Sequence, residues 1–208
     1  MLLLKLIRQF FLPLLLVFVL LIIPWPGLRD GYATAFRAGA NGLFSRFGPA
    51  GSVRFEPVPA DAGGQEHDTL VHFKDAQERT VTKLLCDSRN MGYLPTVVQI
   101  ALILATPIAW SRRWRALLWG LIGITGFVAF KLLILVLKGL SAGPDSVFAS
   151  TPFWTALLDK ALLVFIRLPS TWLLVPVLIW IPVTFRRSDW EQWRQAAARA
   201  RSSAQAGH

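Results

Sequence analysis

The sequence contains few of the residues that build familiar catalytic and metal sites. Among its 208 residues there is one cysteine, Cys86, which excludes an intramolecular disulfide bond. There is no glycine-rich phosphate-binding loop, no His-x-x-x-His metal-binding helix and no Gly-x-Ser-x-Gly nucleophile elbow. His67 and His72 lie five residues apart around a predicted strand, so they would point to opposite sides of it. We therefore predict no metal and no cofactor.

Charged residues are also scarce, and their distribution is uneven. They make up 16% of the chain, whereas hydrophobic residues make up 54%, a composition typical of membrane proteins. The net charge is +10, but residues 27–90 hold eight basic and eight acidic side chains and are neutral. The positive excess lies near the N-terminus, in one short loop and in the C-terminal tail. This pattern indicates the orientation of a membrane protein and argues against nucleic-acid binding.

Four apolar runs are candidates for membrane-spanning helices. The first, from Phe10 to Trp25, follows Lys5 and Arg8 and could cross a hydrocarbon core of about 30 Å with both cations left inside. A cleaved signal peptide is the alternative, because Ala33-Thr34-Ala35 has the form of a cleavage site. This tripeptide lies well beyond the apolar run, and Pro24-Trp25-Pro26 intervenes, so an uncleaved anchor is favoured.

The other three apolar runs are residues 94–110, 116–137 and 161–185. Between the first two lies Ser111-Arg112-Arg113-Trp114-Arg115, a short basic loop of the kind found on the cytoplasmic side. We expect Pro169 to kink or break the last run, because proline cannot donate a backbone hydrogen bond. Four spans place both termini in the cytoplasm and residues 27–93 outside.

Residues 27–93 are predicted to form a small α+β module on the outer side. Apolar and aromatic side chains recur at helical spacing over residues 28–47, which predicts an amphipathic helix. Alternating runs at 52–58, 69–74 and 79–85 predict an antiparallel meander of two or three strands. Such a meander is too small to be stable without the helix or the membrane beneath it. The helix could lie on the outer membrane face or pack on the sheet, and the sequence leaves both open.

The stretch from residue 87 to 96 marks the water-side start of the second membrane helix. Asp87, Ser88 and Asn90 are short polar residues of the kind that cap helices, and Tyr93 suits the membrane–water interface. Pro95 falls in the first helical turn, where an N–H group is not needed. The alternative is a functional site at the membrane surface, lined by Asp87, Ser88, Arg89 and Tyr93.

Two basic residues interrupt the apolar runs. Lys131 lies about 10 Å inward from Lys138 at the helical rise of ~1.5 Å per residue, and Arg167 lies at a similar depth from Lys160. Both could snorkel to the lipid headgroups, or both could point into the helix bundle. Inside the bundle they would need an anionic partner, because the predicted spans contain no acidic residue. That partner would be Asp87, Asp159, or a phosphate or carboxylate supplied by a lipid or a substrate.

Cys86 lies at the predicted outer membrane surface, where nearby cations such as Lys131 and Arg167 would lower the pKa of its thiol. A cysteine on the outer face, followed by basic residues in the next two helices, resembles the exosortase/archaeosortase membrane transpeptidases over residues 86–170. The sequence departs from that family in three ways. Cys86 is followed by Asp-Ser-Arg and not by Ser-Gly, Lys131 stands where an arginine is expected, and there are fewer spans. The alternative is that Cys86 is a small buried hydrophobic residue beside a strand end.

From the sequence we predict a membrane α-helical protein with four transmembrane helices and an extracytoplasmic α+β module between the first two. The expected segments are an N-terminal anchor (1–26), the module (27–93), a three-helix membrane region (94–185) and a basic amphipathic tail (186–208). We expect the tail to bind anionic lipid on the cytoplasmic side. The compact multi-span layout favours a bacterial inner membrane.

The favoured function is non-enzymatic: a subunit or accessory factor whose outer module binds a protein partner in the cell envelope. One alternative is a membrane-embedded acyl or peptidyl transferase, with Cys86 as the nucleophile and Lys131 and Arg167 as anion stabilisers. A second alternative is a protein that binds an anionic lipid-linked substrate without chemistry. We expect no nucleic-acid partner.

Overall fold

The computed structural model describes residues 2–23, 28–45, 51–59, 67–75, 80–141, 151–168 and 170–185. Its elements in chain order are α1 (Leu2–Ile22), α2 (Leu28–Phe44), β1 (Gly51–Pro57), β2 (Thr69–Asp75), β3 (Thr80–Cys86), the π-helix η1 (Arg89–Tyr93), α3 (Leu94–Ala105), α4 (Trp110–Leu140), α5 (Pro152–Leu162), the π-helix η2 (Leu163–Arg167) and α6 (Thr171–Thr184).

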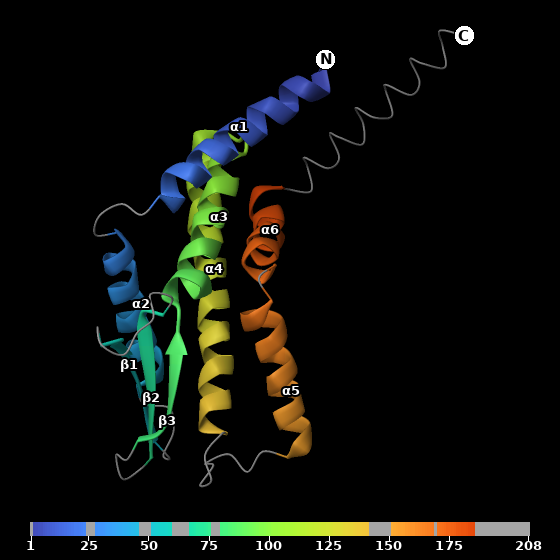
Figure 1. Ribbon diagram of the computed structural model, residues 1–208. Helices are drawn as coiled ribbons and strands as arrows, with labels where there is room; N and C mark the ends of the chain where they lie inside the picture. Colours follow the sequence, from blue (N-terminus) through green and yellow to red (C-terminus); the bar gives the residue numbers. More distant parts are fainter. Residues whose placement is uncertain are drawn as a thin grey trace.

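The long helix α4 is the axis of the molecule (Figure 1). α3 and α6 pack against it and against each other, and α1 packs on α3. The sheet and α2 lie beside the C-terminal half of α4, and in Figure 1 α5 lies on the other side of that half. A helical region and an α+β module therefore share one helix.

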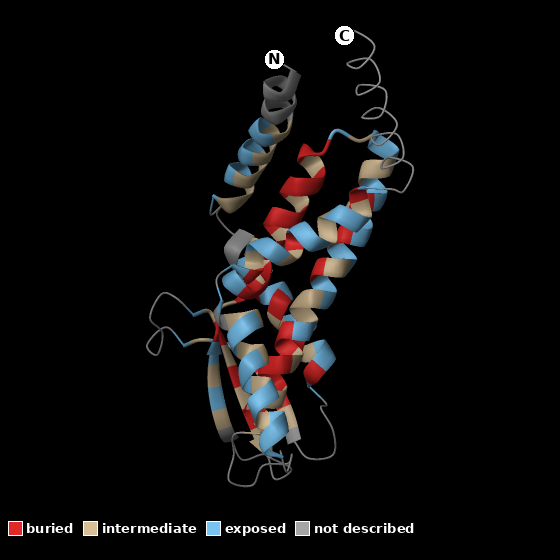
Figure 2. Ribbon diagram, turned by 90° about the vertical axis from the view of Figure 1, so that its right-hand side faces the viewer, coloured by how far each residue is buried: buried red, intermediate tan, exposed pale blue. Residues whose placement is uncertain are grey.

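α4 is buried along one stripe before Lys131 and over most of its residues from Lys131 onward. Before it the buried residues Ala116, Gly120 and Ile124 recur every four positions, as expected for a helix buried along one stripe. From Lys131 to Gly139 most residues are buried (Figure 2), because the module packs on one side of this part of the helix and α5 packs on the other. At ~1.5 Å per residue the 31 residues of α4 extend about 46 Å, which exceeds a hydrocarbon core of about 30 Å. The helix is long enough to serve both regions.

The strands form an antiparallel meander in the order β1-β2-β3. Val53 pairs with Phe73 and Phe55 with Val71, so one sheet face carries apolar side chains that are at most 2% exposed. Phe73 reaches α4 at Gly139, where a Cβ atom would lie only 2.2 Å from Phe73 Cζ. One core cluster joins α2, the sheet, η1 and α4. The predicted meander is confirmed with three strands, and α4 completes its core.

α2 packs on the sheet through Phe36, Ala40 and Phe44, all of which are buried. Asn41 joins α2 to β1, since its Nδ2 donates to Phe55 O at 2.9 Å and its Oδ1 accepts from Phe55 N at 2.8 Å. These bonds occupy outward-facing peptide groups of an edge strand, which would otherwise be open to pairing with another chain. The predicted packing of α2 on the sheet is confirmed, and its placement on the outer membrane face, which is compatible with that packing, stays a prediction. The end of the predicted helix, residues 46–47, lies outside the described residues.

The second predicted helix is shorter than expected. α3 ends at Ala105, and Thr106 is extended (φ −70°, ψ 128°), because a residue directly before a proline is disfavoured in the α conformation. The chain turns over residues 106–109, and α4 begins at Trp110. The prediction of a loop at residues 111–115 is therefore wrong, since these residues form the first turns of α4.

The last predicted span, residues 161–185, is not one helix. The segments Pro152–Ile166 and Thr171–Thr184 are bent by 82° relative to each other. Leu168 is extended (φ −72°, ψ 116°) directly before Pro169, and Pro169 itself lies outside the described residues. The predicted break in this helix is confirmed at this position.

Among the described residues, α4 is long and apolar enough to cross a membrane as a single helix. The bent pair of α5–η2 and α6 could provide a second span, and Phe10–Ile22 is a shorter apolar helix. By length and composition these elements account for one or two spans.

Candidate functional site

Cys86 lies at the end of β3, inside the core of the module. Its side chain is 3% exposed, and its Sγ lies 3.2 Å from Met91 Sδ. Burial raises the pKa of the Cys86 thiol, and the nearby carboxylates of Asp68 and Asp87 raise it further. A nucleophilic cysteine needs the opposite: an accessible thiolate with a lowered pKa. This environment is that of a structural cysteine.

Lys131 points into the protein and not toward lipid headgroups. It is 3% exposed, its Nζ donates to Met91 O at 3.3 Å, and the same atom lies 5.2 Å from the centre of the Phe127 ring. In a regular α-helix the acceptor Met91 O would receive the N–H four residues on, but that residue is Pro95, which has none. Lys131 supplies a donor at this place, where the backbone forms the π-helix η1.

Cys86 and Lys131 therefore meet the same residue, Met91, one at its sulfur and the other at its carbonyl. The arrangement joins β3, η1 and α4 at the boundary between the module and the helical region. Arg167, the third residue of the predicted set, ends η2, and its side chain lies outside the described residues. Its neighbour Phe165 contacts Phe127 with ring centroids 6.3 Å apart, which places η2 beside α4.

The N-cap residues of η1 and α3, Ser88 and Tyr93, make no capping hydrogen bond with their side chains, but Asp87, which was also predicted to cap, binds a backbone N–H at the start of η1. Asp87 Oδ1 accepts from the backbone N–H of Arg89 at 2.9 Å, and Asp87 Oδ2 accepts from Asn90 Nδ2 at 2.5 Å. Burial raises the pKa of the Asp87 carboxyl. Tyr93 donates its hydroxyl hydrogen to Leu21 O and so ties the end of α1 to η1. The side chain of Ser88 does not cap the helix.

Ser88 instead binds Asp68, a residue that the sequence did not single out as functional. Asp68 Oδ2 accepts from Ser88 Oγ at 2.5 Å, and Asp68 Oδ1 accepts from Ser88 N at 3.0 Å and from Thr69 Oγ1 at 2.9 Å. Ser88 is 2% exposed and Thr69 is fully buried. This carboxylate connects the start of β2 to the start of η1, 20 residues later. No local sequence pattern signals such a contact.

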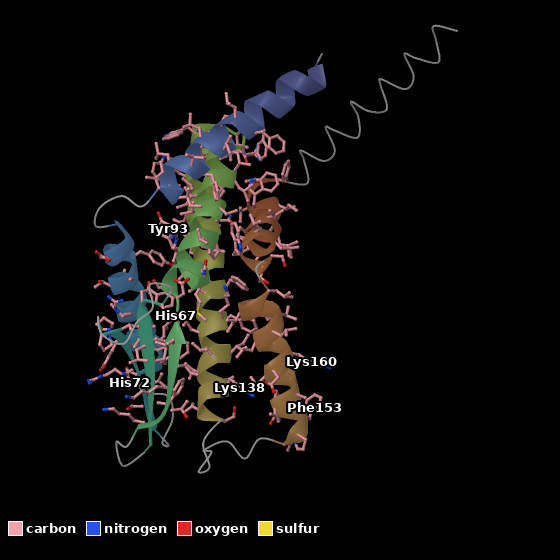
Figure 3. The ribbon with its side chains drawn as sticks, in the orientation of Figure 1. His67, His72, Tyr93, Lys138, Phe153 and Lys160 are labelled. Carbon is pink, nitrogen blue, oxygen red and sulfur yellow. The ribbon has the colours of Figure 1, made fainter. Side chains whose placement is uncertain are left out.

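The two histidines of the described residues, His67 and His72, lie apart in the module. His72 Nε2 lies 3.5 Å from Glu56 Oε2 on the neighbouring strand, while His67 precedes β2 and is exposed (Figure 3). Within the described ranges there is no group of three or more His, Cys, Asp or Glu side chains that could hold a metal ion. In the same view Lys138 of α4 faces α5, where its Nζ lies 2.6 Å from Asp159 Oδ1.

The N-terminal end of α4 holds the ends of two other helices. Arg113 Nη2 donates to Thr106 O at 3.2 Å, and Arg112 Nη2 donates to Thr184 O at 3.2 Å. Trp180 Nε1 donates to Thr106 Oγ1 at 2.8 Å. The two arginines therefore satisfy carbonyls at the C-terminal ends of α3 and α6, which have no partner within their own helices.

A groove of about 230 Å³ opens between α2, α3 and α4. Its walls are mostly apolar, and several of the residues that line it are small. The lining residues are Tyr32, Ala35, Phe36, Gly39, Ala40, Leu43, Thr96, Thr125, Val128, Ala129 and Leu132. Neither Cys86 nor Lys131 lines it. The residues that suggested thiol chemistry and this groove are thus separate features.

Comparison with known proteins identifies one family. The sequence profile of the family described as "Exosortase H-associated membrane protein" matches residues 4–187, which is most of the chain. No curated protein and no solved structure matches the chain. The match covers the helical region and the α+β module together, and we conclude that the chain belongs to the family of exosortase H-associated membrane proteins.

Proposed function

We propose that this protein is a non-enzymatic accessory subunit that binds an exosortase in the membrane and presents the α+β module to it on the outer face. The family description, which names association with exosortase H, supports the choice of partner. The observation that carries the proposal is that the core of the module includes residues of α4: Leu132, Leu135 and Val136 pack into the same cluster as the apolar side chains of α2 and the sheet. The module is therefore held at one height and orientation on a helix that can span the membrane.

The proposed topology follows from the charges on α4. Arg112, Arg113 and Arg115 at its N-terminal end favour the cytoplasm, which puts its C-terminal end and the sheet outside. α1, α3 and the broken α5–α6 segment then complete four crossings, with both termini in the cytoplasm. The module corresponds to residues 27–93 and the helical region to residues 94–185. The basic tail from residue 186 lies outside the described residues, and we expect its cations to bind anionic lipid of the inner leaflet.

The environment of Cys86 favours this function over a cysteine-dependent transferase. A thiol that is 3% exposed and in contact with Met91 cannot attack a substrate without opening of the module core. Lys131 has a backbone acceptor of its own and does not line the groove. Cys86 and Lys131 are therefore both buried and both in contact with Met91, which is a structural role.

Co-purification tests the proposal. The tagged chain is co-expressed with exosortase H, extracted from membranes in a mild detergent and purified through its tag. We expect exosortase H to co-elute in a fixed stoichiometric ratio, with a Cys86→Ala variant retaining it to the same extent. A membrane protein of unrelated function, co-expressed at the same level, is the control. Absence of exosortase H from the eluate of a folded wild-type chain would refute the proposed function.

A further inference from the structure

The outer face of the sheet, which points away from the core of the module, carries a row of basic side chains. Side chains alternate between the two faces of a strand, so the residues that alternate with the buried apolar ones form this outer face. The register places Arg54 opposite His72 and His72 opposite Lys83, which makes one row across all three strands. At a strand spacing of ~4.8 Å this row is about 10 Å long. Lys74 lies on the same face, two residues after His72, and we call these residues the basic face.

The carboxylate of Glu56 offsets part of this positive charge. Its Oε1 lies 3.7 Å from Arg54 Nη1, and its Oε2 lies 3.5 Å from His72 Nε2. Within the described residues, neither Lys74 nor Lys83 has an ion-pair partner. Diagonal neighbours on adjacent strands lie ~7–8 Å apart, within about one Debye length, so the charge of Lys74 repels those of Arg54 and Lys83. The basic face therefore lowers the stability of the free protein, and an anionic partner would relieve this repulsion.

Two leucines extend the same face toward η1. Leu70 lies opposite Leu85, and this pair forms the next row of the sheet, ~7 Å along the strands from His72 and Lys83. Leu85 is 49% exposed. A partner that fits the face therefore carries carboxylates and, about 7 Å from them, an apolar side chain. A polypeptide segment can supply both groups at this spacing.

The direction of the strands favours a protein partner over a lipid surface. The strands run roughly along α4 in both views (Figure 1 and Figure 2). Because α4 crosses the membrane in the proposed topology, the sheet stands upright on the bilayer and the ends of its strands face the headgroups. A flat bilayer would meet these ends and not the basic face. A protein that stands beside α4 can reach the basic face from the side.

We propose that the basic face binds an acidic extracytoplasmic segment of the exosortase, a step that rests on the proposed function. Carboxylates of that segment pair with Arg54, Lys74 and Lys83. An apolar side chain of the same segment packs on Leu70 and Leu85. Complementary charges of this kind steer the encounter of two proteins and fix their register, so the contact sets the orientation of the module on the enzyme.

Charge reversal at Lys83 tests this proposal, and Lys160→Glu is the matched control. Both lysines are exposed, and Lys160 lies on α5, away from the sheet. The tagged chain is immobilised in a mild detergent and titrated with purified exosortase H. In about 0.05 M salt we expect Lys83→Glu to raise the apparent Kd about fivefold or more, and Lys160→Glu to change it less than about twofold. In about 0.5 M salt the difference should shrink to less than about twofold, because salt screens exposed charges.

The unfolding midpoint separates this role from a structural one. Lys83→Glu places a carboxylate opposite His72 and diagonal to Lys74, so it removes repulsion and should not lower the midpoint. A midpoint that fell together with the affinity, or equal Kd values for Lys83→Glu and wild type, would overturn the proposal. If wild type failed to bind exosortase H at either salt concentration, the proposed function would fail as well, and the two failures are thus distinguished.

Carbodiimide crosslinking identifies the contact directly, because the reagent joins a lysine amine to a carboxylate that touches it. We expect mass spectrometry to find an amide between Lys83 and an aspartate or glutamate in an extracytoplasmic segment of exosortase H. Lys83→Arg keeps the positive charge but has no reactive amine, so it should retain the affinity and lose this crosslink. A crosslink from Lys83 to a substrate protein or a second copy of the chain instead, or none at all, would overturn the proposal.

Discussion

Gly139→Ala is the substitution whose effect the structure specifies most closely. The added Cβ would lie 2.2 Å from Phe73 Cζ and 2.4 Å and 2.6 Å from its two Cε atoms. Carbon atoms in contact are normally about 3.5–4.0 Å apart, so the ring or α4 must move by more than about 1 Å. Phe73 is 1% exposed and is held between the sheet and α4, which leaves it no free space to enter.

The magnitude follows from two opposing effects. Overpacking a core of this kind costs about 1–3 kcal/mol. Replacing a helical glycine by alanine returns about 1 kcal/mol. Because three ring atoms would lie 2.6 Å or less from the added Cβ, we expect the overpacking cost to fall in the upper part of this range, about 2–3 kcal/mol. The net loss in the free energy of unfolding is then roughly 1–2 kcal/mol, and at ~2–4 °C per kcal/mol for a chain of this size the unfolding midpoint should fall by about 2–8 °C. Gly126→Ala is the control on the same helix, because a Cβ there meets nothing within 4 Å and should not lower the midpoint.

The single cysteine provides the assay. Cys86 lies in the same core cluster as Phe73, and its labelling by a thiol-reactive dye during heating of the detergent-solubilised protein reports opening of the module. Phe73→Leu should relieve the contact at residue 139, so the double variant should be more stable than the sum of the two single losses predicts. Additive losses, or a Gly139→Ala midpoint equal to that of Gly126→Ala, would show that Phe73 and α4 are not packed as described.

Three further predictions use the same assay or direct unfolding. Asp68→Asn removes the charge that accepts from Ser88 and should cost about 1.5–3 kcal/mol; an unchanged midpoint would exclude this link. Lys131→Met should cost about 1–3 kcal/mol because Met91 O loses a buried donor, while Lys138→Met breaks a partly exposed ion pair and should cost less than about 1 kcal/mol; equal losses would contradict the burial. Finally, stability should fall as the pH rises above ~8.5, the pKa of an unfolded cysteine, because burial raises the pKa of the Cys86 thiol and only the unfolded chain then loses that proton. In a pH series of unfolding midpoints, Cys86→Ala should lack this fall in stability at high pH. An identical pH dependence in both proteins would contradict its assignment to the Cys86 thiol.

The elements that sequence reasoning found are those with local causes. The alternation of Val53 and Phe55, and of Val71 and Phe73, is a period-2 pattern that needs only the strand itself, and the register of β1 and β2 agrees with it. The break before Pro169 has an equally local cause. Pro107 gives the same signal for the turn at Thr106, but the cluster of arginines at residues 111–115 favours a loop five residues further on. They begin a helix instead, where two of them bind carbonyls of α3 and α6.

The parts that sequence reasoning could not supply depend on contacts between distant residues. Asp68 contacts Ser88, Lys131 contacts Met91, and Phe73 contacts Gly139. In each pair, no sequence pattern around one residue predicts that the other is its partner. For Cys86 the sequence placed cations nearby and predicted a lowered thiol pKa. Burial outweighs those cations and raises it, and burial is a property of the assembled core.

The most direct test of the account is exosortase H activity in membranes that contain or lack this chain. Cells without the chain are complemented with the wild-type protein or with Cys86→Ala, and conversion of an exosortase H substrate is measured at matched expression. An accessory subunit without its own chemistry predicts that wild type and Cys86→Ala restore conversion equally. Full conversion without the chain, or loss of conversion in a folded Cys86→Ala variant, would contradict it.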